Sequence, residues 1–409
     1  MGNRALLICP EPLGHHQPAG VGIRFLELAS ALVTAGHQVT VLSPAAGNVE
    51  GARSGPLTPA AIRAETGLAD VALVQGHAAN DFFAHGLRVP TVIDLYDPFI
   101  IENLHYRHPR HETFLHDHET LLRTLRRGDF FLCASEAQRH FYLGMLLSLG
   151  RLNPLVFSSD PTGRNLLDLV PFGVPPPREA PSKSPDNHHL LFGGIYDWYD
   201  PAIAIEAVAR ARETFAGLTL TFTHHPNLDT TPQDVFHRTR EMVSQRGWES
   251  FIRFEPWIPY HQRSRYYDQY RAALLTFRPS IETDLAMRTR IFDFLWGGLP
   301  VITRSAGGTD AILSRFHAGL VVDGDDPAAY ASVIERILRD QEEAASLAAG
   351  TRRFVAEHQW SVVARPLLRF VEAPVFDDTK LHFPERESDL APPRRSFLRR
   401  IHRKLGGAR

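Results

Sequence analysis

The chain has 409 residues, which is longer than one ordinary hydrophobic core supports, so we expect two domains. A hydrophobic fraction of 44% and a charged fraction of 22% describe a soluble globular protein, and a net charge of −2 gives no reason to expect nucleic-acid binding. No apolar run approaches the length of a membrane span, and the opening run ALLICP is too short for the core of a signal peptide. We therefore expect the body of the protein in the cytoplasm.

Two residue types sharpen this expectation. Cys9 and Cys133 both lie in apolar, strand-like runs without the spacing of a disulfide framework, which favours a reducing compartment. Lysine occurs only at positions 183, 380 and 404, whereas arginine is abundant. A fixed cation that faces a phosphate is therefore expected to be an arginine.

The first half of the chain alternates short apolar strands with helical segments. A helix over about residues 23–35 carries Phe25, Leu28, Ala29 and Leu32 on one face, and Gly36 ends it. Alternation of this kind predicts a parallel sheet with helices on both faces. The expected strands are residues 5–10, 37–44, 71–76, 91–97 and 130–135.

A proline-rich stretch divides the chain. Residues 171–187 can sustain neither a helix nor a strand ladder, and a second α/β pattern starts at residue 188. We expect an N-terminal Rossmann-like domain on the acceptor side over residues 1–172, a hinge over 173–187, and a C-terminal Rossmann-like domain over 188–373. Two such domains leave a cleft between them, which is a usual place for a ligand.

The last part of the chain has a different composition. Residues 374–409 lose the α/β pattern and are expected to be disordered, ending in a basic segment. Within residues 394–409 there is no acidic residue, and Phe397, Leu398, Ile401 and Leu405 fall on one helical face. The segment is either a solvated tail or a short helix on anionic lipid headgroups, and we favour the membrane surface.

Glycines mark two strand-to-helix turns. Gly20 and Gly22 open the first helix but lack the third glycine of the dinucleotide fingerprint, so they are either a close approach for a ligand or a plain loop. Gly193 and Gly194 end the first strand of the second domain and would let a phosphate or a sugar approach the backbone. The aromatic side chains that follow, at positions 198 and 199, either stack on a base or pack in the core.

The densest cluster of polar side chains follows the buried strand at residues 274–277. Glu282, Asp284, Arg288 and Arg290 lie in the loop and first helical turn after it, and Asp293 lies on nearly the same helical face as Arg290. Cations and N–H groups hold a diphosphate, and carboxylates hold ribose and sugar hydroxyls. The alternative is an Arg–Asp ion-pair network that only stabilises the helix start.

These motifs resemble the retaining GT-B glycosyltransferases of group 1. The resemblance rests on Gly20-Val21-Gly22 with the run AGHQVTVLSP, on VPFGV at 170–174, on DFLWGGLPV at 293–301, and on Gly307-Gly308 with the strand at 319–322. It implies an α/β GT-B fold, in which two Rossmann-like domains face each other across a cleft.

The resemblance also implies roles for individual residues. The family uses two carboxylates separated by seven residues, the second five positions before the glycine of Gly-x-Pro. Counting back from Gly298 gives Asp293, expected on the ribose, and then Leu285, so that Glu282 or Asp284 must replace the first carboxylate. The family places an arginine and a lysine on the diphosphate, and Arg288 and Arg290 are the replacements here.

By this resemblance the chain is expected to be a retaining hexosyltransferase. It would move a sugar from a nucleoside-diphosphate sugar to a hydroxyl of a glycan or lipid-linked acceptor in cell-envelope polysaccharide or glycolipid synthesis. The alternatives are a non-catalytic nucleotide-sugar-binding partner on a membrane, or a nucleotide-sugar epimerase on the same fold. The expected catalytic residues are Glu282, Asp284, Arg288, Arg290 and Asp97, and the expected donor-binding residues are Gly20, Gly22, Gly193, Gly194, Asp293, Gly307, Gly308 and Thr309.

Asp97 ends a strand at the expected cleft edge. It either positions a hydroxyl near the reacting sugar or caps the turn before Pro98. Neither a metal ion nor a cofactor other than the donor substrate is expected, because helix ends and cations are expected to stabilise the leaving diphosphate.

Overall fold

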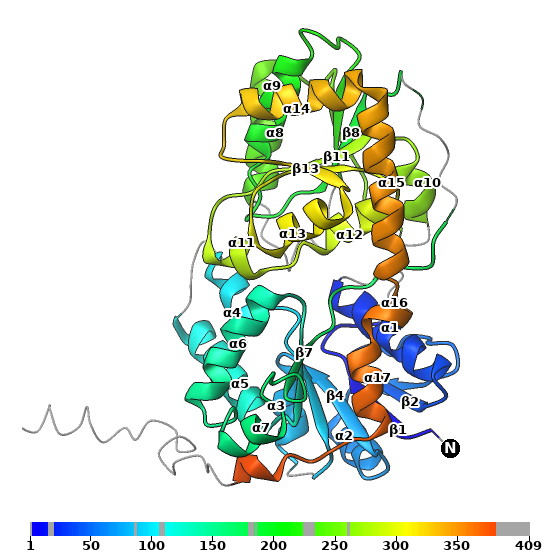
Figure 1. Ribbon diagram of the computed structural model, residues 1–409, viewed down its shortest axis with the longest axis vertical. Coiled ribbons are helices and arrows are strands. Elements are labelled where there is room, and N and C mark those ends of the chain that lie inside the picture. Colours follow the sequence, from blue (N-terminus) through cyan, green and yellow to red (C-terminus); the bar gives the residue numbers. More distant parts are fainter. Residues whose placement is uncertain are drawn as a thin grey trace, which may run out of the picture.

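The computed structural model describes residues 2–14, 20–85, 88–105, 111–178, 184, 186–223, 234–259 and 262–381. Two parallel sheets lie one above the other along the long axis of the molecule (Figure 1). The first belongs to the N-terminal domain and the second to the C-terminal domain. Each is covered by helices on both faces, as the alternating pattern predicts.

The N-terminal sheet has seven parallel strands in the order β3-β2-β1-β4-β5-β6-β7. The chain order reverses between β1 and β4, which is where an open α/β sheet usually binds its ligand. The strands are β1 (Arg4–Ile8), β2 (Gln38–Ser43), β3 (Arg53–Pro56), β4 (Val71–Gln75), β5 (Thr91–Asp94), β6 (Phe130–Cys133) and β7 (Leu167–Leu169).

Helices pack on the two faces of this sheet for reasons visible in the sequence. The predicted apolar face of α1 (Gly20–Thr34), made of Phe25, Leu28, Ala29 and Leu32, is buried in one core. The other face is covered mainly by α2, α3, α5 and α6. The remaining elements are α2 (Pro59–Thr66), α3 (Ala78–Phe83), α4 (Phe99–Glu102), η1 (Asn103–His105), α5 (His111–Arg127), α6 (Glu136–Ser148) and α7 (Pro154–Ser159).

The C-terminal sheet has six parallel strands in the order β10-β9-β8-β11-β12-β13, so its order reverses between β8 and β11. Its strands are β8 (His189–Gly194), β9 (Thr219–Thr223), β10 (Ile252–Glu255), β11 (Ala272–Leu275), β12 (Val301–Arg304) and β13 (Gly319–Val322). Its helices are α8 (Pro201–Ala211), α9 (Asp234–Arg246), α10 (Arg263–Tyr267), α11 (Ile281–Leu285), α12 (Thr289–Trp296), α13 (Gly307–Phe316), α14 (Pro327–Arg339) and α15 (Gln341–Glu357).

The chain crosses between the domains twice. Near the start of the predicted hinge, Val174 pairs with Gln359, and the Phe172 and Trp360 rings meet edge to face at 4.9 Å. A Cβ atom on Gly173 would come within 2.5 Å of the Trp360 ring, so this crossing requires glycine. Residues 179–183 and 185 of the predicted hinge lie outside the described residues.

After the second crossing the chain returns to the first domain, which changes the predicted boundary at residue 373. Helices α16 (Trp360–Val363) and α17 (Arg365–Glu372) lie beside α1 and β1, and α17 buries Leu367 and Val371 there (Figure 1). The Phe370 ring stacks on Phe130 of β6 at 4.8 Å. Residues 360–373 are therefore part of the N-terminal domain, because the amphipathic α17 finds its apolar partners on that sheet.

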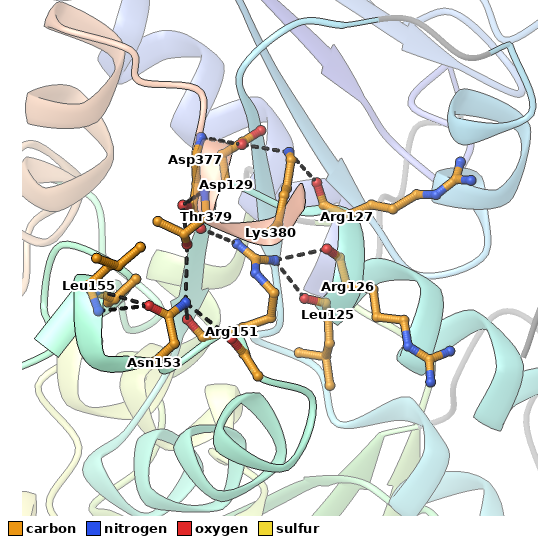
Figure 2. A network of polar contacts seen from close by, with 12 residues as sticks. Leu125, Arg126, Arg127, Asp129, Arg151, Asn153, Leu155, Asp377, Thr379 and Lys380 are labelled. Carbon is orange, nitrogen blue, oxygen red and sulfur yellow. Dashed lines mark hydrogen bonds and ion pairs between the residues drawn. The ribbon is translucent and has the colours of Figure 1, made fainter. Parts of the chain in front are cut away.

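The start of the predicted disordered tail is also packed. The turn η3 (Asp378–Leu381) follows Asp377, whose carboxylate accepts from Arg151 at 2.6 Å, and Lys380 meets Asp129 at 2.6 Å (Figure 2). Since Arg151 and Asp129 are buried, these ion pairs attach residues 377–380 to the first domain. The prediction of disorder is wrong for these residues, and the basic segment 394–409 lies outside the described residues.

Candidate active site

The carboxyl edges of the two sheets meet at the junction between the domains. From the first domain, Gln138 donates to the carbonyl oxygen of Leu285 at 3.0 Å, and Tyr96 shares a side-chain hydrogen bond with Thr289. Leu285 ends α11 and Thr289 begins α12, and α11 lies directly above α4 and α6 in Figure 1. The predicted segment from α11 to the start of α12 therefore lies at this junction.

Arg290 lies across the Gly193-Gly194 turn at the end of β8. Its guanidinium donates to the carbonyl oxygen of Gly194 and stands 5.2 Å from the centre of the Tyr196 ring. Gly193 has φ +82°, and a Cβ there would meet Arg290 Cδ at 3.0 Å. The Tyr196 ring in turn stacks on Trp198 at 4.9 Å. Gly193, Gly194 and Arg290 therefore lie in contact with one another, and their role in binding a donor stays a prediction.

Arg288 lies in a different environment from Arg290. Its two terminal nitrogens donate to the two carboxylate oxygens of Glu282 at 2.8 and 2.7 Å, and both side chains are buried. The guanidinium also lies over the rings of Phe277 and Tyr199 at 5.3 and 5.6 Å. Glu282 and Arg288 thus form a bidentate pair that joins α11 to the start of α12, which is the ion-pair alternative considered from the sequence. Their catalytic roles stay predictions.

Asp293 faces a cation that sequence reasoning missed. Its carboxylate lies 3.1 Å from Arg263, and the Arg263 guanidinium stands over the Trp296 ring at 4.8 Å. Burial raises the pKa of Asp293, while the charges of Arg263 and Arg290 lower it. Asp293 therefore belongs to the same charged group as Arg290. A buried arginine at the start of the short α10 has no distinctive sequence signal.

The glycines at the start of α13 have a packing role in this structure. Gly307 has φ +54°, and a Cβ there would come within 2.8 Å of the carbonyl oxygen of Asp284. Gly308 lies against Met287 and against Ser135 of the first domain, and Thr309 is buried. Asp284 itself is exposed. Close backbone approach explains these glycines, and their contact with a donor stays a prediction.

On the first-domain side, Glu11 occupies the start of α1. Its carboxylate accepts from the backbone N–H of Gly22 at 2.8 Å, at a helix end that attracts anions. Burial raises the pKa of Glu11, the bond from Gly22 lowers it, and the charge of Asp97 raises it. The predicted ligand approach at Gly20 and Gly22 therefore already holds a carboxylate of the chain. Glu11 lies three residues after the end of β1, and this position near the carboxyl end of a strand was the signal that could have identified it.

Asp97 is paired with Glu102, which sequence reasoning also missed. Their side chains share a hydrogen bond, and the charge of Glu282 from the other domain acts on both. Burial raises the pKa of Asp97 to about 6, and burial and the charge of Asp97 raise the pKa of Glu102 well above its usual value. One proton held between the two carboxyls accounts for such a pair.

A buried ion pair fixes the end of β5 beneath these groups. Arg24 of α1 binds Asp94 through two bonds of 2.6 and 3.0 Å, and both side chains are fully buried. Arg24 also donates to the carbonyl oxygen of Pro171. An arginine next to the apolar face of a predicted helix signals a buried partner, although the pattern does not identify which carboxylate it meets.

The described residues contain no cluster of three or more His, Cys, Asp or Glu side chains arranged to hold a metal ion. None of the described helices combines the length and the apolar character that a bilayer crossing requires.

Comparisons with known proteins agree with this architecture. Residues 205–369 match the family model described as glycosyl transferase-like. A D-inositol 3-phosphate glycosyltransferase of Frankia alni is 31% identical over 129 residues, which cover 32% of this chain and 30% of the relative. One of Thermobispora bispora is 31% identical over 127 residues, covering 31% of this chain and 28% of the relative. The chain thus aligns with less than a third of the length of these two relatives.

Solved structures resemble a much larger part of the chain. HepE of Anabaena in complex with UDP-glucose has a TM-score of 0.66 at 14% identity, covering 90% of this chain and 99% of that one. Sucrose-phosphate synthase of Thermosynechococcus elongatus has a TM-score of 0.61 at 16% identity, covering 90% and 98%. The fold is therefore GT-B, as predicted. Together, the family model over residues 205–369, the relatives and the solved structures show that the chain is similar to glycosyltransferases and has the GT-B fold.

Proposed function

We propose that the protein transfers a hexose from a nucleoside-diphosphate sugar to an acceptor hydroxyl with retention at the anomeric carbon. The observation that carries the proposal is Arg290 lying across Gly193 and Gly194 at the end of β8, with Asp293 on the same helix. This surface offers a cation and close backbone approach to a diphosphate, and a carboxylate to ribose hydroxyls. HepE, which has the same fold, was solved with UDP-glucose, so UDP-sugars are the first donors to test.

The proposed chemistry uses charge stabilisation rather than a protein nucleophile. As the sugar–phosphate bond breaks, negative charge accumulates on the diphosphate, and Arg290 stands where it can offset that charge. The acceptor hydroxyl attacks from the face that the phosphate leaves, and its proton passes to the departing phosphate oxygen. Closure of the domains around the donor would exclude water and limit hydrolysis.

The direct test of this proposal is to follow the reaction of the full chain with UDP-glucose. We expect slow release of UDP and glucose without an acceptor, and the α-anomer of the product when an acceptor is present, determined by NMR. No UDP release from any of UDP-, GDP-, ADP- or dTDP-glucose would contradict transferase activity. A β-linked product would contradict retention alone.

A second candidate is a non-catalytic nucleotide-sugar-binding partner. The position where the family pattern expects its first carboxylate is Leu285, and this side chain packs against the core of the first domain. A protein of this kind would gain thermal stability from UDP-glucose, since ligand binding stabilises the folded state, but would leave the donor intact. The hydrolysis measurement therefore separates the two candidates.

The biological setting also belongs to the proposal. We place the protein in cell-envelope polysaccharide or glycolipid synthesis at the cytoplasmic membrane surface, because the basic segment 394–409 has the charge and the apolar spacing to bind anionic lipid. Vesicle co-sedimentation with and without residues 391–409 tests this placement. Equal pelleting of the two forms would contradict it.

A further inference from the structure

Gln75 is a buried amide with no hydrogen-bond partner among the described residues. Its side chain is 4% exposed, and neither Oε1 nor Nε2 is bonded. An unpaired buried polar group destabilises the folded state, and native structures contain few of them. Gln75 has two such atoms on one side chain. This makes it a candidate for contact with a group that the described residues do not supply.

The position of Gln75 places it beside the carboxyl groups of the first domain. Gln75 ends β4, which lies between β1 and β5 in the sheet, at the point where the strand order reverses. Glu11 follows β1, and Asp97 follows β5, in which Asp94 is the register partner of Gln75. Because parallel strands end at the same edge, the amide lies between the strand ends that carry Glu11 and Asp97.

The charges at this edge disfavour an anion. Three carboxyl groups lie close together here. Besides burial, the charge of Asp97 raises the pKa of Glu11 on one side and the pKa of Glu102 on the other. The two arginines beside them are already bound, Arg24 to Asp94 and Arg288 to Glu282, each through two hydrogen bonds. A phosphate here would face carboxylates, whereas a hydroxyl can both donate to a carboxylate and accept from an amide N–H.

We propose that Gln75 binds an acceptor hydroxyl, and that the part of the acceptor entering this edge is uncharged and rich in hydroxyl groups. The inference rests on the proposed function and adds the acceptor class to it. It sets the chain apart from the curated relatives, whose name contains a phosphorylated inositol. Oε1 of Gln75 accepts from the hydroxyl, and Nε2 donates to a neighbouring oxygen of the acceptor. The carboxyls of Asp97 and Glu102 orient the same acceptor molecule.

The test measures UDP release from UDP-glucose by the full chain in the presence of matched acceptor pairs. The pairs are myo-inositol and D-inositol 3-phosphate, glycerol and glycerol 3-phosphate, and glucose and glucose 6-phosphate. We expect at least one neutral member to accelerate UDP release about tenfold more than its phosphorylated counterpart. A phosphorylated member that works better, or no acceleration by any member, would overturn the inference.

Two variants separate binding from packing. Gln75→Leu removes the unpaired amide, and Thr303→Val is the matched control, because Thr303 Oγ1 is also buried and unpaired but lies in β12 of the other domain. We expect neither variant to melt below the wild type and both to keep the thermal stabilisation by UDP. Only Gln75→Leu should lose the acceptor-dependent acceleration. Unchanged acceleration in Gln75→Leu would overturn the inference, whereas absence of any UDP effect in the wild type would contradict the proposed function itself.

Discussion

Both domains bring the carboxyl edge of a parallel sheet to the junction, yet the charged groups at the two edges differ. The C-terminal edge presents Arg290 over a pair of glycines, with Asp293 held by Arg263. The N-terminal edge presents Glu11, the Asp97–Glu102 pair and the amide of Gln75. The same topology therefore supports two chemistries, since cations and glycines suit a diphosphate whereas carboxyls and an amide suit hydroxyl groups.

The Glu282–Arg288 pair provides the largest expected effect on stability. Glu282→Ala leaves the Arg288 guanidinium buried without its carboxylate, and breaking such a pair costs about 3–5 kcal/mol. We expect a marked fall in the midpoint of urea unfolding, measured by far-UV circular dichroism. Arg315→Ala is the control, because the Arg315–Glu357 pair is exposed and should contribute little. Equal midpoints for wild type and Glu282→Ala would show that the pair does not support the fold.

Arg290 should affect turnover more than stability. Removing a group that stabilises developing charge typically lowers kcat about 100- to 1,000-fold, and we expect Arg290→Ala to fall in that range with UDP-glucose. Arg278→Ala is the control, since Arg278 is largely exposed beside Asp200 at the same sheet edge. Wild-type turnover in Arg290→Ala would remove the main support for a donor site at the carboxyl edge of the C-terminal sheet.

Asp97 should give the smallest effect, and a pH-dependent one. Because burial raises the pKa of Asp97 to about 6, the folded state binds a proton that the unfolded state has released between pH 4 and 6, and stability is lost as the pH rises through that window. Asp97→Asn cannot ionise, so we expect it to melt higher than wild type at pH 7.5 and nearly the same at pH 4.5. A melting difference that is constant across this pH range would contradict the raised pKa.

The sequence predicted the layers of the fold better than the partners of individual side chains. The spacing of Phe25, Leu28 and Leu32 was sufficient to predict the buried face of α1, because helical periodicity is a local property. That Arg24 on the same helix meets Asp94, 70 residues away, depends on how α1 and β5 pack and could not be derived from spacing.

The same limit applies to the candidate site. An arginine at a helix start suits both a phosphate and a buried carboxylate, so the sequence could not distinguish Arg290 on the glycine turn from Arg288 paired with Glu282. Gly307 illustrates a related ambiguity, because the absence of a side chain serves close backbone packing as well as ligand approach. Both distinctions depend on tertiary contacts.

The most direct test of the central claim is a calorimetric titration of the full chain with UDP, GDP, dTDP and ADP, repeated with Arg290→Ala. If the C-terminal edge holds a diphosphate through Arg290, one nucleotide should bind the wild type in the micromolar range, and the variant should bind it at least about tenfold more weakly, a loss of about 1.4 kcal/mol. Silence with all four nucleotides, or equal affinity in the variant, would contradict the account.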